Sequence, residues 1–485
     1  MTDPRFVLAA LAIPFAGIVL MTLARRRPDV REAMTFGAAA MLFFVVASLA
    51  PAVLAGERPA ITLFEMLPGL PVAFTVEPLG WLFAAVASSL WVVSTPYTIA
   101  YLRGNGEANQ TRFFACFAAS IGAAIGIAFA GNLLTLFLFY EMLTLVTYPL
   151  VTHHGTDEAR RAGRVYLGLL IGTSVVFFLP ALIITSLLAG TLDFRPGGIL
   201  GGRVGPAGAG LLLALFMFGI GKAALMPFHR WLPTAMVAPA PVSALLHAVA
   251  VVKAGVFCVV KVIVYVFGVD ALAALGGAGW LTLVAGFTLI AASAVALRAQ
   301  NLKRRLAYST VSQLAYVTMA ASLLTPAAVM GAALHLVAHA FGKITLFFAA
   351  GSIYTAAHKT EVGELDGIGR AMPWTMGAFA VGALSMIGLP PMAGFVSKWY
   401  ILTGAMAVEH WIAVGVIAAS TLLNAAYFLP IVFRAFFVAP PAGEAPGQEA
   451  PAAMVIAQVL TAAACVALFL FPGFAIAFAK SLAGG

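Results

Sequence analysis

Charged residues are scarce in this chain of 485 residues: only 9% are Asp, Glu, Lys or Arg, whereas 62% are hydrophobic. Soluble proteins carry about a quarter charged residues, so this composition excludes an ordinary soluble fold. Apolar runs of about 18 or more residues recur from end to end, each long enough to cross about 30 Å of hydrocarbon as a helix. We therefore expect an all-α polytopic membrane protein, with residues 1–485 forming a single membrane domain in the lipid bilayer.

Cysteine and nucleotide-binding motifs are also lacking. Cys116, Cys258 and Cys465 all lie in apolar segments and form no C-x-x-C pair, which excludes a disulfide framework and an iron–sulfur or zinc-ribbon site. No Walker A loop is present, nor a G-x-G-x-x-G after a strand, so we expect no cofactor. The net charge of +9 does not indicate nucleic acid, because the basic residues lie in short loops between apolar runs.

The apolar runs predict about fourteen transmembrane helices. Their expected first residues are Phe6, Met34, Leu79, Arg112, Asn132, Gly163, Ala207, Pro241, Ala271, Arg304, Pro326, Met372, Glu409 and Ala453. The first run is expected to be a signal anchor, since arginines follow it rather than precede it. The segment 440–451, rich in Pro and Gly, is expected to be a flexible link before the last helix.

The basic residues predict the orientation of the chain. If the loop after the first run faces the cytoplasm, loops on that side hold 17 of the 27 Lys and Arg residues, and the opposite side holds five. Cytoplasmic loops are enriched in Lys and Arg. We therefore expect a multi-pass protein of the cell (plasma or inner) membrane, with both termini on the non-cytoplasmic side.

Six charged residues nevertheless fall inside the predicted spans, together with three histidines. They are Glu141, Lys222, Lys253, Lys261, Lys343, Lys398, His247, His335 and His339. A charge at the centre of a bilayer costs about 3 kcal/mol on insertion scales, so we expect most of these groups to face the bundle interior or a hydrated path. Lys261 lies near a helix end and is expected to extend its ammonium to the headgroups. Glu141 is the only acid in a predicted span interior.

His335, His339 and Lys343 recur every four residues, which places them along one helix face over about 12 Å. Histidine exchanges protons near neutral pH, so a stripe that ends at a buried lysine favours a proton relay. Two alternatives stay open: a metal or haem site, although the pattern lacks the glutamate of H-E-x-x-H, and ordinary structural histidines.

Two of the predicted spans contain prolines that should break their helices. Lys222 lies about one turn before Pro227, and Lys398 lies about two turns after the Pro390–Pro391 pair. These are the seventh and twelfth spans, and an offset of five helices inverts the orientation. The sequence thus predicts two inverted five-helix repeats, residues 112–268 and 271–435, each with one broken helix. Interrupted helices at matching positions indicate a transport path.

Five segments together resemble one family, the antiporter-like subunits of respiratory complex I, membrane-bound hydrogenases and multisubunit Mrp-type cation/proton antiporters. The resemblance covers roughly residues 75–435. The segments are LFLFYEMLTLV, KAALMPFHRWLPTAMVAPAPVSALLHAVAVVKAGVF, NLKRRLAYSTVSQLAY, HLVAHAFGKITLFFAAGSI and GLPPMAGFVSKWY.

The resemblance implies a proton path through named residues. Glu141 matches the fifth-helix glutamate of the family, Lys222 the lysine of its first broken helix, and Lys253 its eighth-helix lysine. His335, His339 and Lys343 match the eleventh-helix relay, with His247 beside Lys253 as an unusual addition, and Lys398 matches the terminal residue on the twelfth helix. We expect Lys222 to pair with Glu141 in one state and to release its proton when that pair separates.

Among family members the pairing of Lys253 with Lys398 is most similar to the D subunit of Mrp-type antiporters. This implies a proton-translocating subunit of a Na+ or K+/H+ antiporter, without a chemical active site of its own. Its expected partners are other hydrophobic subunits, including a second antiporter-like subunit. Three alternatives remain: a proton-pumping subunit of complex I or a hydrogenase, a haem- or metal-binding membrane enzyme using His247, His335 and His339, and a scaffold for partner helices.

Overall fold

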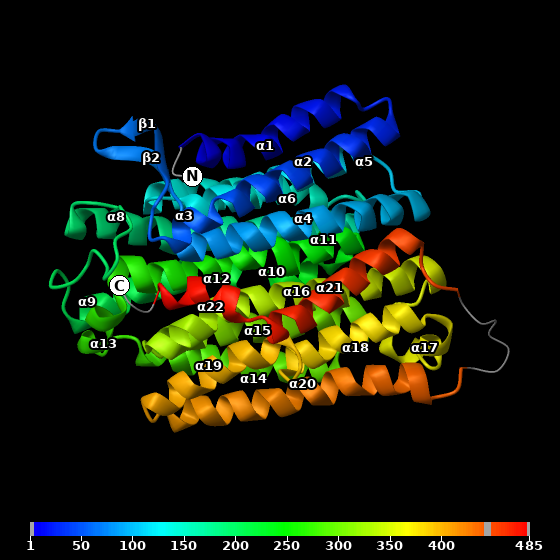
Figure 1. The fold of residues 1–485 in the computed structure, drawn as a ribbon. Coiled ribbons are helices and arrows are strands. Elements are labelled where there is room, and N and C mark those ends of the chain that lie inside the picture. Colours follow the sequence, from blue (N-terminus) through cyan, green and yellow to red (C-terminus); the bar gives the residue numbers. More distant parts are fainter. Residues whose placement is uncertain (1–3, 441–447, 483–485) are drawn as a thin grey trace.

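The computed structural model describes residues 4–440 and 448–482, so most of the predicted link at 440–451 lies outside the described residues. The first part of the chain holds a hairpin and the helices around the first break (Figure 1). Its elements are α1 (Pro4–Leu23), α2 (Pro28–Ser48), α3 (Ala50–Leu54), β1 (Ala60–Leu67), β2 (Leu70–Thr75), α4 (Pro78–Gly104), α5 (Gln110–Phe129), α6 (Leu133–Val151), α7 (Asp157–Thr173), the π segment η1 (Ser174–Phe178), α8 (Leu179–Ala189), α9 (Pro206–Gly219), the 3₁₀ turns η2 (Gly221–Ala223) and η3 (Ala235–Val237), and α10 (Trp231–Thr234).

The second part runs from the helix after the first break to the C-terminal helices. Its elements are α11 (Ala240–Ala244), the π segments η4 (Leu245–Val249) and η5 (Val262–Phe267), α12 (Val251–Lys261), α13 (Val269–Leu275), α14 (Gly279–Arg298), α15 (Leu302–Ser322), α16 (Pro326–Ala357), the 3₁₀ turn η6 (Val362–Glu364), α17 (Ile368–Ala371), α18 (Pro373–Ile387), α19 (Ala393–Ala407), α20 (Trp411–Phe437), α21 (Ala452–Leu470) and α22 (Gly473–Lys480).

Eleven of the described helices are long and apolar enough to cross a membrane, fewer than the fourteen predicted. Two of the missing spans contain α9 and α18, which are apolar but end after 14 and 15 residues because the chain breaks there. The third is α15, whose hydroxyl, amide and basic side chains lower its hydropathy. The polytopic helical class is thus confirmed, while the count of fourteen and the repeats 112–268 and 271–435 stay predictions.

One prediction about the class was incomplete, because the chain is not wholly helical. β1 and β2 form an antiparallel hairpin in which Ala60 pairs with Thr75 and Leu67 with Leu70. It lies at one end of the bundle, beside the start of α4 (Figure 1). β1 is almost entirely exposed, including Phe64 at 58%. The segment lies between the second and third predicted spans, where the sequence analysis predicted no element.

Helix α2 begins six residues earlier than predicted, at Pro28 rather than Met34. Proline suits the first turn of a helix because it needs no backbone donor there. Arg31 and Glu32 consequently lie inside the helix and are buried, and Arg103 from the end of α4 forms an ion pair with Glu32 at 2.5 Å. Glu141 is therefore not the only carboxylate within a span.

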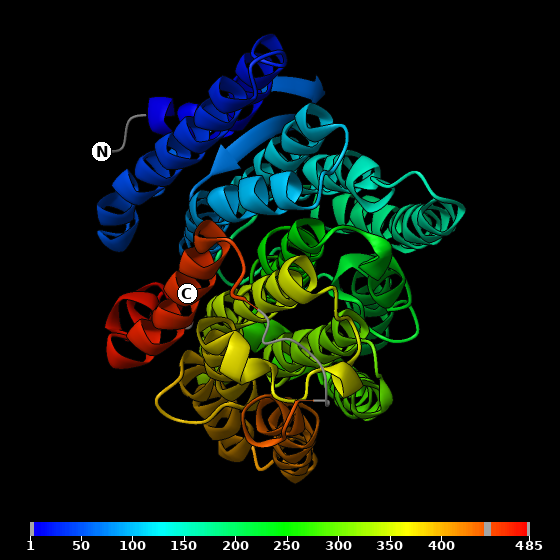
Figure 2. The same cartoon turned by 90° about the vertical axis from the view of Figure 1, so that its right-hand side faces the viewer.

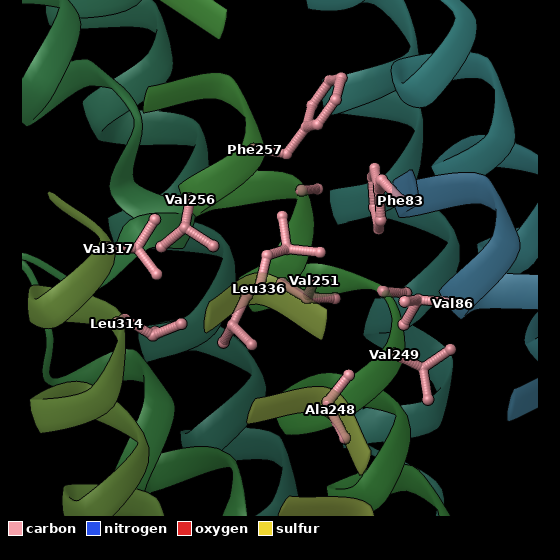
Figure 3. Packing of buried hydrophobic residues seen from close by; sticks show 14 of the residues in the cluster. Phe83, Val86, Ala248, Val249, Val251, Val256, Phe257, Leu314, Val317 and Leu336 are labelled. Carbon is pink, nitrogen blue, oxygen red and sulfur yellow. The ribbon is translucent and has the colours of Figure 1, made fainter. Parts of the chain in front are cut away.

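The core of the molecule surrounds α12 and α16. Every residue in the most apolar window of Ala240–Phe267 is buried, and so are 94% of those in the window of α16. A helix that is apolar on all sides is buried on all sides. Side chains from α4, α12, α15 and α16 pack together there (Figure 3). In Figure 2 the green and yellow helices lie between the blue N-terminal helices and the orange helix α20. Polar groups within these windows of α12 and α16 are thus almost all shielded from lipid.

Candidate functional site

The first break places Lys222 inside the bundle. α9 ends at Gly219, and the 3₁₀ turn η2 then carries Lys222 through an interruption that continues past Pro227. Gly255 of α12 lies directly against the backbone of Lys222, with no room for a Cβ atom. A glycine is therefore needed at this point, and it brings α12 close to the break.

Lys222 is fully buried, and its ammonium is bound by helix α6. Its Nζ donates to the Tyr140 carbonyl at 2.8 Å and to the Thr144 hydroxyl at 2.6 Å, and it lies 3.2 Å from the centre of the Tyr140 ring. The expected ion pair with Glu141 is not formed, although the carboxylate exerts a Coulombic attraction on Lys222. The structure thus holds the lysine on the residues that flank Glu141.

Glu141 lies on α6 between the buried face and the lateral surface of the chain. Its neighbour Tyr140 points inward and is fully buried, whereas Glu141 itself is half-buried. Its Oε1 atom is buried without a hydrogen-bond partner among the described residues. An unpartnered buried carboxylate oxygen is costly, so this oxygen is suited to receive a donor from inside the bundle.

Lys253 and His339 meet at the centre of the molecule. Lys253 on α12 and His339 on α16 are buried, and Lys253 Nζ lies 2.5 Å from His339 Nδ1. One of the two nitrogens must offer a lone pair and the other a proton, because two donors cannot form this bond. The pair is therefore a site at which a single proton is shared between an amine and an imidazole.

The other residues of the α16 stripe reach two further helices. His335 Nδ1 lies 2.9 Å from the Ser397 hydroxyl of α19, and the His335 and His339 rings stack with centroids 6.1 Å apart. Lys343 Nζ donates to the Ser309 hydroxyl of α15 at 2.8 Å, and Tyr427 of α20 donates to the same hydroxyl at 3.1 Å. The stripe thus connects α12, α15 and α19.

The second break holds Lys398 differently. α18 ends at Ile387, and Lys398 follows in α19, whose first residue is Ala393. The Lys398 Nζ turns back and donates to the carbonyls of Met386 and Ile387 at 2.9 and 3.0 Å. The last carbonyls of a helix have no partner in the helix and carry partial negative charge, so an ammonium is favoured there.

His247 is buried near the same centre, but it contacts no polar group. Both ring nitrogens lack hydrogen-bond partners among the described residues, and the ring lies 4.7 Å from that of Phe347. Within residues 4–440 and 448–482, no three His, Cys, Asp or Glu side chains come together as a metal site would require. His339, moreover, already uses Nδ1 in its contact with Lys253. The three histidines therefore do not form a common ligand set.

The prediction for Lys261 was wrong. Instead of reaching the headgroups, Lys261 is fully buried and forms an ion pair with Glu77 at 3.1 Å, between Nζ and Oε2. Its Nζ also donates to the Ala130 carbonyl at 2.8 Å. The hairpin end of the molecule covers this part of α12, which a sequence pattern cannot show. Glu77 was missed because it directly precedes α4 and was assigned to a loop.

Other polar residues around the lysines were also missed by the sequence analysis. They are Tyr140, Thr144, Ser309, Ser397, Tyr427 and Ser385, which bonds the Gly394 amide. Hydroxyl side chains are common in membrane helices, where they usually bond their own backbone. Their spacing therefore gave no signal that they face a lysine or histidine.

A separate polar cluster lies at the end of the bundle opposite the hairpin. Glu107, in the loop after α4, is 3.1 Å from His154 and 3.6 Å from His153. Burial alone would raise the pKa of Glu107, but the hydrogen bond from His154 and the nearby imidazoles hold it below its usual value. That hydrogen bond raises the pKa of His154, while burial lowers that of His153. Glu107 and His154 line a cavity of about 190 Å³.

Comparisons with known proteins identify a family and several relatives to which this chain is similar. Residues 130–424 match the family described as NADH:quinone oxidoreductase/Mrp antiporter, transmembrane region. The chain is 29% identical to the N subunit of the NADH-quinone oxidoreductase of Desulforudis audaxviator over 96% of its own length and 95% of that protein. It is 32% identical to the A/B component of a probable K(+)/H(+) antiporter of Rhizobium meliloti over 89% of its length, but it spans only 43% of that relative.

A solved structure shares the fold. The Mrp complex from Dietzia sp. contains a chain that superposes with a TM-score of 0.86 at 19% identity, covering 99% of this chain and 96% of that one. At this identity the match establishes the fold alone. The polytopic helical architecture of the protein is therefore one found within a multisubunit membrane complex.

Proposed function

Because the chain belongs to the NADH:quinone oxidoreductase/Mrp antiporter family, we propose that it is a proton-translocating subunit of a multisubunit Na+ or K+/H+ antiporter, similar to the D subunit of Mrp-type complexes. The observation that supports this most is the contact of Lys253 with His339 at 2.5 Å. It joins two helices in the most buried part of the molecule, where an isolated pair of bases serves no packing purpose. The antiporter relative supports the choice of cation/proton exchange.

In the proposed path, protons pass through groups that can each donate and accept. Lys222 occupies the first break, the Lys253–His339 pair the centre, and Lys398 the second break. The stacked His335 and His339 rings connect the centre to Ser397, the residue beside Lys398 in sequence. Lys343 and the Ser309 hydroxyl form a side branch of the path toward Tyr427. His247, whose ring nitrogens have no hydrogen-bond partner among the described residues, is the remaining residue of the proposed path.

Two states of Lys222 provide the coupling in this proposal. In the structure its ammonium is bound by Tyr140 and Thr144, with Glu141 nearby but unpaired. A shift of the ammonium by about one helix position would bring it to Glu141 and stabilise its charge; the reverse shift would favour proton release to Lys253. An equilibrium between two such states responds to any neighbouring charge that prefers one of them.

The half-buried position of Glu141 indicates how partners would act. We propose that a second antiporter-like subunit covers the exposed part of α6, while the buried Glu141 Oε1 atom stays available to a group inside this chain. The inverted repeats 112–268 and 271–435, location in the cell membrane and non-cytoplasmic termini belong to the same proposal. The two breaks, each with one lysine, support the repeats, and the uneven distribution of arginines supports the orientation.

A redox-driven role is the second candidate. It is favoured by the match to the N subunit of an NADH-quinone oxidoreductase, which extends over 95% of that protein. The buried path would be unchanged, but its driving force would come from electron transfer in other subunits. Mass spectrometry of what co-purifies with the chain from native membranes discriminates the two: small hydrophobic subunits support the antiporter, and flavin or iron–sulfur subunits support the redox complex.

The proposed path is tested with everted membrane vesicles that contain the complete complex, by following collapse of a pH gradient on addition of NaCl or KCl. Glu141→Ala and Lys222→Ala should each abolish the response while the complex still assembles, because each removes a required charge. Lys480→Ala serves as a control, since Lys480 is exposed and lies far from the path in sequence. Transport at the rate of the unsubstituted protein in either path variant would contradict the proposal.

A further inference from the structure

The ion pair of Glu77 and Lys261 lies apart from the proposed path and has the features of a binding site. Glu77 is 6% exposed and Lys261 is fully buried, with 3.1 Å between Oε2 and Nζ. The ammonium also donates to the Ala130 carbonyl at 2.8 Å and lies over the Phe194 ring at 4.3 Å. Carboxylate, carbonyl and an aromatic face together form a pocket for a single positive charge.

The carboxylate is open to a cavity on its other side. A cavity of about 300 Å³ has Glu77, Thr75, Arg58 and Tyr265 on its walls, while Lys261 is not among its lining residues. The Glu77 Oε2 atom is buried and faces the Lys261 ammonium at 3.1 Å. Glu77 therefore lies between a tethered ammonium inside the protein and a space large enough for a hydrated ion.

We propose that Glu77 is a binding site for a monovalent metal cation, sodium or potassium, for which Lys261 is a built-in competitor. A buried carboxylate requires one positive charge beside it, because an unpaired buried charge is strongly destabilising. Oxygen ligands of the kind that such cations use are present: the Glu77 carboxylate, the Ala130 carbonyl and the Thr75 hydroxyl, which lies beside Gly131.

The exchange balances in charge and atoms. The protonated Lys261 and ionised Glu77 pair accepts one cation from the cavity; Lys261 becomes a neutral amine, Glu77 holds the cation, and one proton is released to water. The reverse reaction takes up a proton and expels the cation. One cation is thus exchanged for one proton at a fixed net charge of the site, which is the elementary step that an antiporter requires.

Besides Glu77, two charged or titratable side chains of the described residues line the cavity, Arg58 and Tyr265. Arg58 is exposed and donates to the carbonyls of Val53 and Glu57, so its charge stays hydrated at the mouth. On the inner side, the thiol of Cys258 on α12 lies near Lys261.

Equilibrium binding of ²²Na+ and of ⁸⁶Rb+, as a substitute for potassium, to the full-length purified chain tests the proposal between pH 7 and pH 10. Binding to the unsubstituted protein should increase with pH, with one proton released per cation. Lys261→Arg should bind no cation at any pH, because the guanidinium keeps its proton and stays on Glu77. Lys261→Met should bind at every pH and at least tenfold more tightly at pH 7, and Glu77→Gln should not bind.

The controls separate this site from the rest of the chain. Glu57→Gln removes an exposed carboxylate nearby and should leave binding unchanged. If Lys261→Met does not fold, Lys261→Arg and Glu77→Gln still decide the question. Equal binding by Lys261→Arg and the unsubstituted protein, or binding retained in Glu77→Gln, would overturn the inference. Glu141→Gln should bind normally, so a failure of the proposed proton path and a failure of this site give different results.

Discussion

The two broken helices carry the same sequence elements, a lysine and nearby prolines, yet they hold the lysine in opposite ways. In the first break the Lys222 ammonium leaves its own helix and is bound by α6. In the second break the Lys398 ammonium turns back to the last carbonyls of α18, within the same interrupted span. Lys222 therefore depends on the packing of two helices, whereas Lys398 completes the end of one.

Because they are held in different ways, the two lysines are suited to different functions. A group bound by a neighbouring helix changes its surroundings when that helix moves, which suits coupling to a partner near Glu141. A group that caps its own helix end keeps its surroundings, which suits a fixed point of exchange. The comparison leads to two predictions, and a third concerns the polar cluster of Glu107 and His154; they are given from the largest expected effect to the smallest.

Substitution by methionine should destabilise the second break more than the first. Lys398→Met leaves two buried helix-end carbonyls without donors, at about 1–3 kcal/mol each. Lys222→Met removes the ammonium that donates to the Thr144 hydroxyl. That hydroxyl keeps a partner, because it donates to the Tyr140 carbonyl of its own helix at 3.4 Å. Both substitutions remove the cost of burying an ammonium, so this contribution cancels between the two variants. Their free energies of unfolding should therefore differ by about 2 kcal/mol or more.

Unfolding of the purified chain by increasing SDS in mixed micelles measures this difference. Lys480→Met is the matched control, since it exchanges an exposed lysine for the same residue. Equal losses of stability at both breaks would show that the hydrogen bonds of Lys398 to α18 contribute nothing, and the comparison would fail.

Removing one hydroxyl should weaken the first break alone. Thr144→Val keeps the shape of the side chain but deletes the acceptor of the 2.6 Å bond from Lys222. A hydrogen bond to a charged group contributes about 1.5–3 kcal/mol, so proton transport should slow by roughly tenfold or more. Thr147→Val, one turn further along α6, deletes a hydroxyl bonded to Tyr166 and should leave transport near normal.

The rates are compared in the same vesicle measurement after correction for the amount of assembled complex. A Thr144→Val variant as fast as Thr147→Val would mean that Lys222 is not held on α6 during turnover. In that case the contrast with Lys398 would apply to the resting structure only.

The smallest effect is expected at the Glu107–His154 pair, which lies in loops outside the spans. The raised pKa of His154 gives stability that is present below pH 6.5 and lost as pH rises through its folded pKa. The lowered pKa of Glu107 gives stability that is present above pH 4.5 and lost as pH falls through its folded pKa. The pair should therefore stabilise most between about pH 4.5 and 6.5.

Thermal unfolding of Glu107→Gln beside the unsubstituted protein checks this window. The difference in Tm should be largest near pH 5.5 and should shrink as the pH rises through the folded pKa of His154. Glu158→Gln, an exposed carboxylate on α7, is the control and should show little change at either pH. A difference in Tm that grows with pH would contradict the assignment of the pair.

Much of the fold could be predicted from the sequence, because hydropathy and proline act locally. Long apolar runs must become helices in a bilayer, since each backbone group has to be bonded within its own segment. Proline removes a backbone donor and favours a break inside a helix, so both breaks were expected, although Pro96 and Pro430 lie inside continuous helices. The exposed hairpin and the early start of α2 were missed, because short or mixed segments are decided by what packs against them.

The candidate site could be predicted only as a set of residues. An intramembrane lysine or histidine can be recognised by the free energy it costs on insertion, and the candidate residues were chosen on that basis. The sequence alone determined that these groups are buried somewhere in the bundle. Only the tertiary structure decided that Lys253 meets His339, that Lys222 lies on Thr144 rather than Glu141, and that Lys261 pairs with Glu77. These pairings depend on helix contacts between residues far apart in the chain, and a local pattern cannot specify distances of a few ångströms across them.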